Sequence, residues 1–298
     1  MGAPSIQVND LYFAFGVQSG VLEKIYIEFP VNNVIEEGKE KQKSGSSWVH
    51  EPRAREIEEV MLLIASGLSI SANKKINIEF GSRVIEWIEN GQLSSLKVSM
   101  CGGLGNESDS REIGSPMFLR SILVGVIEKQ HDPAFTFFIR GADDALSHRF
   151  IEAYYNFYFF IEYLYGSGKF KTKKIINEFL VSEELGEALD SVIKDEVLAT
   201  VASKDFIKML KGASHEEIYS HIVSTRGGLQ HPKKVGPKIW HPEKQYDYLN
   251  EATFLHLVCL NIAMKRYYSV AFSERVESAY KNVMHCLHRK SKIHIVTK

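Results

Sequence analysis

The segment from Asp143 to Tyr165 constrains the fold most, because aromatic residues recur along it at helical spacing. These rings occupy all sides of the predicted helix, so we expect the helix to be central or packed on two faces. The alternative is that some rings stack on nucleic-acid bases, although aromatic side chains at this spacing more often form a core. The aromatic residues are Phe150, Tyr154, Tyr155, Phe157, Tyr158, Phe159, Phe160, Tyr163 and Tyr165.

Helical periodicity continues through the second half of the chain. Ser214 is the expected N-cap of one of these helices, and Glu217, three residues later, completes a capping box. Gly227 and Gly228 are expected to break that helix. We therefore predict an all-helical domain over residues 115–298, with helices at 117–129, 143–165, 173–180, 183–202, 215–225, 248–272 and 274–289.

The first third of the chain has a different pattern. Short alternating runs at 21–29, 75–80 and 93–100 predict strands, and residues 52–66 predict a helix. We predict a mixed α/β domain over residues 1–114, so the expected fold class is α+β, with this region followed by an all-α bundle. The glycine-rich stretch 101–114 is the expected boundary; a phosphate-binding loop is the alternative, but the P-loop pattern is absent.

Length and composition limit the class of protein. A chain of 298 residues suits two domains, and 36 basic residues against 37 acidic ones argue neither for nor against a nucleic-acid partner. The three cysteines form no Cys-x-x-Cys pair and are expected to be free thiols, with Cys259 in the core. No signal peptide and no apolar run of about 18 residues is apparent, which predicts a cytoplasmic protein without a membrane partner.

The most informative motif is Arg226-Gly-Gly-Leu-Gln-His231, followed by Pro232. A predicted helix leads into Arg226, and a loop and a long apolar helix follow Pro232. The arrangement resembles the HEPN superfamily, whose signature is Arg, four to six residues, then His between two helices of a small bundle. The resemblance covers roughly residues 140–275. Many active members carry Asn or Asp directly after the Arg, where this chain has Gly227.

The resemblance implies a metal-independent endoribonuclease that acts as a homodimer in defence, toxin activity or RNA processing, without a cofactor. Arg226 would bind phosphate and His231 would be the acid/base. Elementary chemistry agrees, because imidazole moves protons near neutral pH and guanidinium binds phosphate oxygens bidentately. The alternative, a non-catalytic RNA- or protein-binding module with a degenerate site, stays open, as does a structural role for Arg226 at a helix end.

Other candidate residues leave more alternatives open. Lys233 and Lys234 form a short basic loop that either binds substrate phosphates or is simply solvated. His285 and His288 share a helical face, but His294 is the one further ligand that the sequence offers, so no metal site is predicted. The carboxylates in the aromatic segment, Glu152 and Glu162, either orient the motif or lie exposed, and exposure is favoured.

Overall fold

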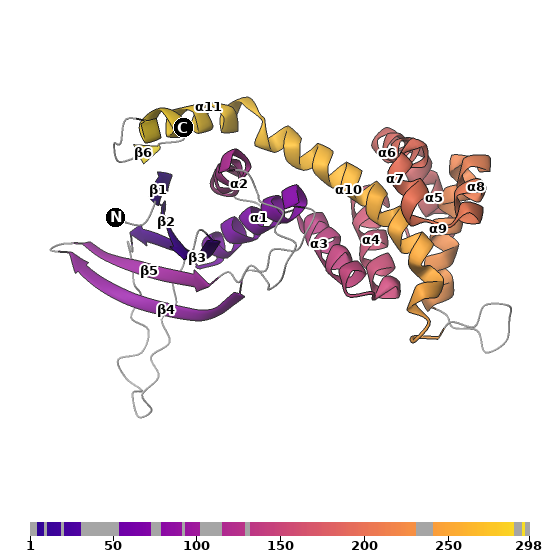
Figure 1. The fold of residues 1–298 in the computed structure, drawn as a ribbon, viewed down its shortest axis with the longest axis horizontal. Coiled ribbons are helices and arrows are strands. Elements are labelled where there is room, and N and C mark those ends of the chain that lie inside the picture. Colours follow the sequence, from indigo (N-terminus) through magenta and orange to yellow (C-terminus); the bar gives the residue numbers. More distant parts are fainter. Residues whose placement is uncertain are drawn as a thin grey trace. The chain divides into compact units, whose positions relative to one another are not determined.

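The computed structural model describes residues 5–8, 11–18, 21–30, 54–72, 79–90, 93–101, 115–128, 132–230, 241–288 and 294–295. The chain divides into two compact units (Figure 1). The sheet unit comprises residues 1–68, 76–131 and 270–298, and the helical unit comprises residues 69–75 and 132–269. This grouping differs from a division at residue 114, and whether residues 1–114 and 115–298 fold as separate domains stays a prediction.

The sheet unit contains a six-stranded sheet with the strand order β4-β5-β3-β2-β1-β6. The first five strands pair antiparallel, and β6 pairs parallel to β1. The predicted strands at 21–29 and 93–100 are confirmed as β3 and β5. The strands are β1 (Ser5–Val8), β2 (Leu11–Gln18), β3 (Val21–Pro30), β4 (Glu79–Asn90), β5 (Leu93–Cys101) and β6 (His294–Ile295).

Among the described residues, the sheet unit also contains three helices: α1 (Ala54–Ala72, in this unit up to Leu68), α2 (Ser115–Glu128) and α11 (Glu274–His288). Helices α1 and α2 approach closely at Gly125. A Cβ at this position would lie 2.7 Å from Ile64 Cγ1 and 2.8 Å from the Val60 carbonyl oxygen. The absence of a side chain at Gly125 therefore permits this contact.

The helical unit is a bundle of α-helices, as predicted. Helix α10 belongs to this unit up to Ser269. The elements are α3 (Pro133–Leu146), α4 (Phe150–Tyr165), α5 (Thr172–Val181), α6 (Glu183–Lys194), α7 (Glu196–Val201), α8 (Lys204–Gly212), α9 (His215–Gln230), the 3₁₀ turn η1 (Gln245–Tyr248) and α10 (Leu249–Ala271).

The aromatic helix α4 forms the centre of the bundle core. Phe157 and Tyr158 are fully buried, and the Cys259 thiol of α10 donates a hydrogen bond to the Phe157 carbonyl at 3.5 Å. On the other side, a Cβ at Gly141 of α3 would lie 2.6 Å from the Phe157 ring, so glycine allows α3 and α4 to form a tight hairpin. The predicted core role is confirmed for Cys259 and for most of the aromatic rings of the segment, whereas Tyr163 is exposed.

The predicted single helix over 143–165 is wrong, because the chain turns between α3 and α4. His148 has a positive φ of 57°. The Asp144 carboxylate accepts hydrogen bonds from Arg149 Nη2 at 2.5 Å and from Asn156 Nδ2 at 2.8 Å. This side chain therefore fixes the turn, a local effect that the aromatic periodicity does not reveal.

The predicted fold class, α+β with a mixed N-terminal region followed by an all-α bundle, is also wrong. Of the residues whose side chains the structure describes, 86% are helical. The long helices supply nearly all of the described core, so they, and not the alternating runs of the first third, determine the class. The described part of the chain is therefore predominantly helical. None of the described helices is long and apolar enough to cross a membrane.

Candidate functional site

Arg226 lies within α9, about one turn before its last residue, Gln230. Its side chain is half-buried, and Cζ lies 5.4 Å from the centroid of the Tyr158 ring on α4. Arg226 Nε is buried and has no hydrogen-bond partner among the described residues. One face of the guanidinium contacts a ring, and no hydrogen bond from its N–H groups to a described residue is recorded. A guanidinium in this environment can still bind an anion.

Tyr154, one turn before Tyr158 on α4, fixes α9 next to Arg226. Its hydroxyl donates a 2.6 Å hydrogen bond to the Ile222 carbonyl oxygen, and the bond is buried. Burial raises the pKa of Tyr154 well above its usual value, and a hydrogen bond with Thr225 opposes this rise. Tyr154 therefore stays a neutral donor that anchors the turn of α9 leading to Arg226.

Glu251, in the first turn of α10, lies close to His221 of α9. It is 9% exposed, and Oε1 lies 4.0 Å from Nε2 of His221 on α9. Its second oxygen, Oε2, is buried without a hydrogen-bond partner in the described part of the chain. A buried carboxylate with an unsatisfied oxygen is costly, so this position favours a nearby cation or donor.

The charge of Arg226 acts on the pKa values of two neighbouring tyrosines of α4. Burial raises the pKa of Tyr158, Glu162 raises it further, and the charge of Arg226 opposes the rise. Burial also raises the pKa of Tyr155, and Arg226 again opposes it. Both phenols therefore remain neutral at physiological pH, so the guanidinium charge is not cancelled by these rings.

The structure accounts for only part of the predicted site. Arg226 is placed as described above, whereas His231, Lys233 and Lys234 lie outside the described residues. The expected break at Gly227 and Gly228 is wrong, because α9 runs through both glycines to Gln230. Open space surrounds both positions, and neither has a positive φ. The helix tolerates two glycines here because residues on either side of them, Val223 and Leu229, are buried.

The carboxylates of α4 take different positions. Glu152 is exposed, as favoured. Glu162 is half-buried and accepts a 3.2 Å hydrogen bond from the Tyr158 hydroxyl. Glu162 therefore orients the ring beneath Arg226 without contacting the guanidinium in any recorded ion pair.

Sequence reasoning missed three members of the site: Tyr154, Glu251 and His221. The tyrosine is one of many aromatic residues in its segment. An acidic residue in the first turn of a helix is usually interpreted as a dipole contact. His221 lies five residues before Arg226, outside the motif from Arg226 to His231. Only the packing of α4, α9 and α10 distinguishes these residues from their neighbours.

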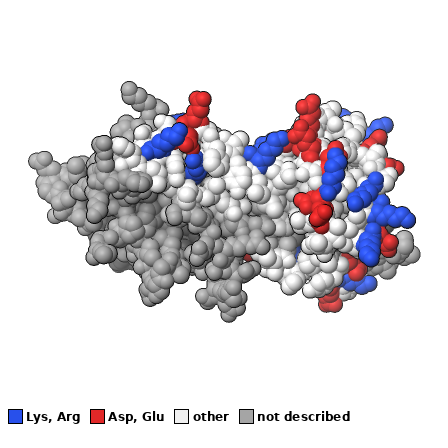
Figure 2. Space-filling view, turned by 45° about the horizontal axis from the view of Figure 1, so that its top comes forward, with Lys and Arg blue, Asp and Glu red and all other residues white. Residues whose placement is uncertain are grey.

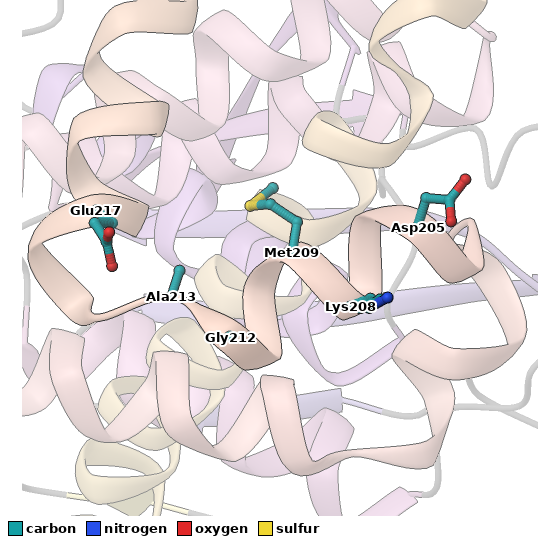
Figure 3. Close-up of a pocket in the computed structure, with 6 residues that line it drawn as sticks. All are labelled: Asp205, Lys208, Met209, Gly212, Ala213 and Glu217. Atoms are coloured by element: carbon teal, nitrogen blue, oxygen red, sulfur yellow. The ribbon is translucent and has the colours of Figure 1, made fainter.

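A separate open hollow lies where α8 ends and α9 begins (Figure 3). Arg226 is not among its lining residues, so the hollow is not the candidate site. On the face shown in Figure 2, Lys and Arg are interspersed with Asp and Glu over the described surface. Among the described residues, no group of three or more His, Cys, Asp or Glu side chains is placed to hold a metal ion. The hollow is lined by Asp205, Lys208, Met209, Gly212, Ala213 and Glu217.

Comparison with known proteins adds no assignment. No protein-family model matches the sequence, and neither a curated protein nor a solved structure shows significant similarity to it.

Proposed function

We propose that the helical unit is a metal-independent endoribonuclease of HEPN type. The observation that carries the proposal is the half-buried Arg226, whose Nε is buried and lacks a hydrogen-bond partner within the described residues. Buried polar atoms are nearly always hydrogen-bonded, so an unmatched donor on this side chain supports a polar ligand close to it.

In the proposed reaction the ribose 2′-oxygen attacks the adjacent phosphate. Arg226 binds the phosphate oxygens and stabilises the charge that develops on them, and His231 moves a proton. Lys233 and Lys234 bind neighbouring phosphates. Two subunits bring their motifs together in a homodimer. The setting is cytoplasmic RNA processing, toxin activity or defence, in keeping with the HEPN resemblance of the motif.

The test uses purified protein, mixed single-stranded RNA and excess EDTA. We expect wild type to cleave RNA but not substrates with 2′-O-methyl groups. Arg226→Gln should lose about 10²–10³-fold in rate, and His231→Ala about 10²–10⁴-fold. Arg140→Gln, at an exposed arginine of α3, is the control for the change in net charge. Cleavage that survives the changes at both Arg226 and His231 would contradict the proposed site.

A second candidate is a non-catalytic RNA-binding module, which Gly227 favours, because its position directly after Arg226 carries no side chain to orient the guanidinium. A Cβ at Gly227 would meet nothing within 4 Å, so Gly227→Asn fits without rearrangement. If wild type binds RNA without cleaving it and Gly227→Asn cleaves it, the site is degenerate. If both bind and neither cleaves, the binding module is the better description.

A further inference from the structure

The turn from α4 to α5 exposes an aromatic ring that the proposed reaction does not use. Phe170 is 93% exposed, more than any other large apolar residue in the described part of the chain. The Lys169 amide donates a 2.9 Å hydrogen bond to the Gly166 carbonyl oxygen, and this bond closes the turn. Ser167 and Gly168 have positive φ angles of 48° and 66°, which change the direction of the chain. Phe170 therefore lies at the end of a closed turn and does not belong to the core.

Lysines surround this ring. Residues 169–174, which we call the Phe170 surface, contain four lysines, and all four are exposed. Lys169 lies 4.0 Å from Glu178, whereas no ion pair with a described residue is recorded for the other three. The first turn of α5 contains no acidic residue. The Phe170 surface therefore combines an exposed aromatic ring with a local excess of positive charge. The four lysines are Lys169, Lys171, Lys173 and Lys174.

This combination fits a single-stranded nucleic acid. Sites for unpaired strands combine positive side chains, which contact the phosphates, with aromatic rings, on which the bases stack. A base within a duplex is already stacked on its neighbours, so the ring of Phe170 requires an unpaired base. Lysine contacts phosphate as a point charge, and phosphate contacts carry no base sequence. The surface therefore suits a flexible polyanion with little sequence preference.

Two other occupants fit less well. A helix that lies in a membrane interface presents a continuous apolar face, but the apolar residues Ile175 and Phe179 of α5 are buried in the bundle. The exposed Leu180 and Val181 lie at the other end of α5, roughly 12 Å or more from its start. Phe170 therefore has no apolar neighbour at the turn with which to enter a membrane. The cores of protein interfaces are depleted in lysine, which argues against a protein partner.

We propose that the Phe170 surface binds single-stranded RNA, with an unpaired base on the Phe170 ring and phosphates on Lys171, Lys173 and Lys174. The choice of RNA rests on the proposed endoribonuclease function. The surface is separate from the proposed catalytic site, since none of its residues is recorded in contact with Arg226 in the described structure. Its role is to hold the strand, and it takes no part in the cleavage step.

Binding of a labelled, uncleavable 2′-O-methyl oligoribonucleotide tests the aromatic ring. Phe170→Ala should weaken binding about 5- to 150-fold, the range expected for the loss of one stacked base. Phe170→Leu should weaken it similarly, because leucine is apolar but has no flat ring, whereas Phe170→Tyr should bind as wild type does. The same oligomer made of abasic residues should bind wild type and Phe170→Ala equally. The control is Val181→Ala, at an apolar residue that is 76% exposed.

The salt dependence of the same binding tests the lysines. The triple variant Lys171→Gln, Lys173→Gln, Lys174→Gln should reduce the slope of log affinity against log salt by about 2, because each phosphate contact of a single strand contributes about 0.7. The matched control has the same change at three exposed lysines of α8 and should keep the slope. Circular dichroism checks that each variant is folded. The control lysines, which also have no ion pair recorded with a described residue, are Lys204, Lys208 and Lys211.

The outcomes separate this surface from the Arg226 site. If Arg226→Gln weakens RNA binding and the changes at the Phe170 surface do not, the inference alone is overturned. If wild type binds no RNA, the inference and the proposed function both fail. If RNA binding depends on the Phe170 surface but wild type cleaves no RNA, only the proposed function fails.

Sedimentation with vesicles of phosphatidylcholine and phosphatidylserine tests the membrane as the other occupant. We expect Phe170→Ala to leave vesicle binding unchanged while it weakens RNA binding. If Phe170→Ala abolishes binding to the vesicles and RNA binding persists, the surface belongs to a membrane contact and the inference is overturned.

Discussion

Two arginines, one in each unit, show how the surroundings of a guanidinium separate structure from function. Arg120 of α2 is 7% exposed and lies between the Phe272 and Tyr280 rings, with Cζ 4.3 and 4.2 Å from their centroids. It donates 2.9 and 2.5 Å hydrogen bonds to the Ala271 carbonyl oxygen and to Glu277. Arg226 contacts one ring, at 5.4 Å, and its Nε has no partner within the described residues.

The difference leads us to expect different roles for the two arginines. Arg120 joins the end of α10 to the first turn of α11, and the protein itself satisfies its charge and donors. Such a group contributes to stability and has little left for a ligand. Arg226 contacts one ring and makes no recorded hydrogen bond to a described residue, so its N–H groups can donate to an anion. The comparison therefore predicts opposite responses of the two sites to substitution.

The largest effect on folding should come from Arg120→Met. This change keeps the apolar stem but removes the charge and both hydrogen bonds, and we expect the free energy of unfolding to fall by about 3 kcal/mol. Without Arg120, the pKa of Glu277, which the hydrogen bond from Arg120 lowers, should return towards its usual value. Urea unfolding followed by circular dichroism measures the change. If the free energy of unfolding falls only as little as expected at an exposed site, Arg120 does not have the structural role described above.

The next largest effect concerns His256 of α10, another buried group whose Nε2 has no partner among the described residues. Its ring stacks on Phe157 with the centroids 5.0 Å apart, and burial lowers its pKa to about 4. An unfolded histidine has a pKa near 6.5, so between these values only the unfolded state binds the proton. The stability that His256 contributes is thus fully present above about pH 6.5 and is lost as the pH falls towards 4.

We expect wild type to lose about 2 kcal/mol of unfolding free energy through His256 between pH 7 and pH 5. His256→Phe keeps a ring against Phe157 and should remove this component. Urea midpoints of the two proteins at several pH values give the difference directly. Parallel pH profiles would show that His256 is already satisfied, and an unpartnered buried atom would then be weak evidence for a site at Arg226 as well.

The smallest effect should come from Arg226→Gln. Because the structure records no ion pair or hydrogen bond for this side chain in its described surroundings, we expect the free energy of unfolding to change by less than about 0.5 kcal/mol. Thermal unfolding of Arg226→Gln is measured alongside that of Arg120→Met and Arg140→Gln. A loss similar to that of Arg120→Met would mean that Arg226 is structural.

Local sequence signals predicted the core rings and one helix start of the helical unit, although not the fold class. The helical spacing of α4 identified the core rings, and Ser214 with Glu217 forms the expected capping box, with a 2.7 Å bond from the Ser214 amide to Glu217 Oε2. The turn at His148 depends on Asp144, and the continuation of α9 through Gly227 depends on packing. Neither the turn nor the continuation of the helix leaves a periodic signal in the sequence, because each depends on contacts of a few residues.

The candidate site was only partly predictable. Arg226 was found because the motif joins it to His231 along the chain. Glu251 and Tyr154 join the site only when α10 and α4 pack against α9, and such contacts between distant segments leave no spacing in the sequence to recognise. The contacts that these two residues make with α9 therefore had to come from the structure.

We propose that Arg226 binds a phosphate, and RNA affinity tests this role most directly. The measurement is the fluorescence anisotropy of a labelled, uncleavable 2′-O-methyl oligoribonucleotide at several salt concentrations. Arg226→Gln should weaken binding about 10- to 100-fold, the loss expected for a charge-assisted hydrogen bond, and should reduce the salt slope by about 1. Arg140→Gln should change affinity by less than about twofold. Equal affinities of wild type and Arg226→Gln, with the same salt slope, would contradict the account.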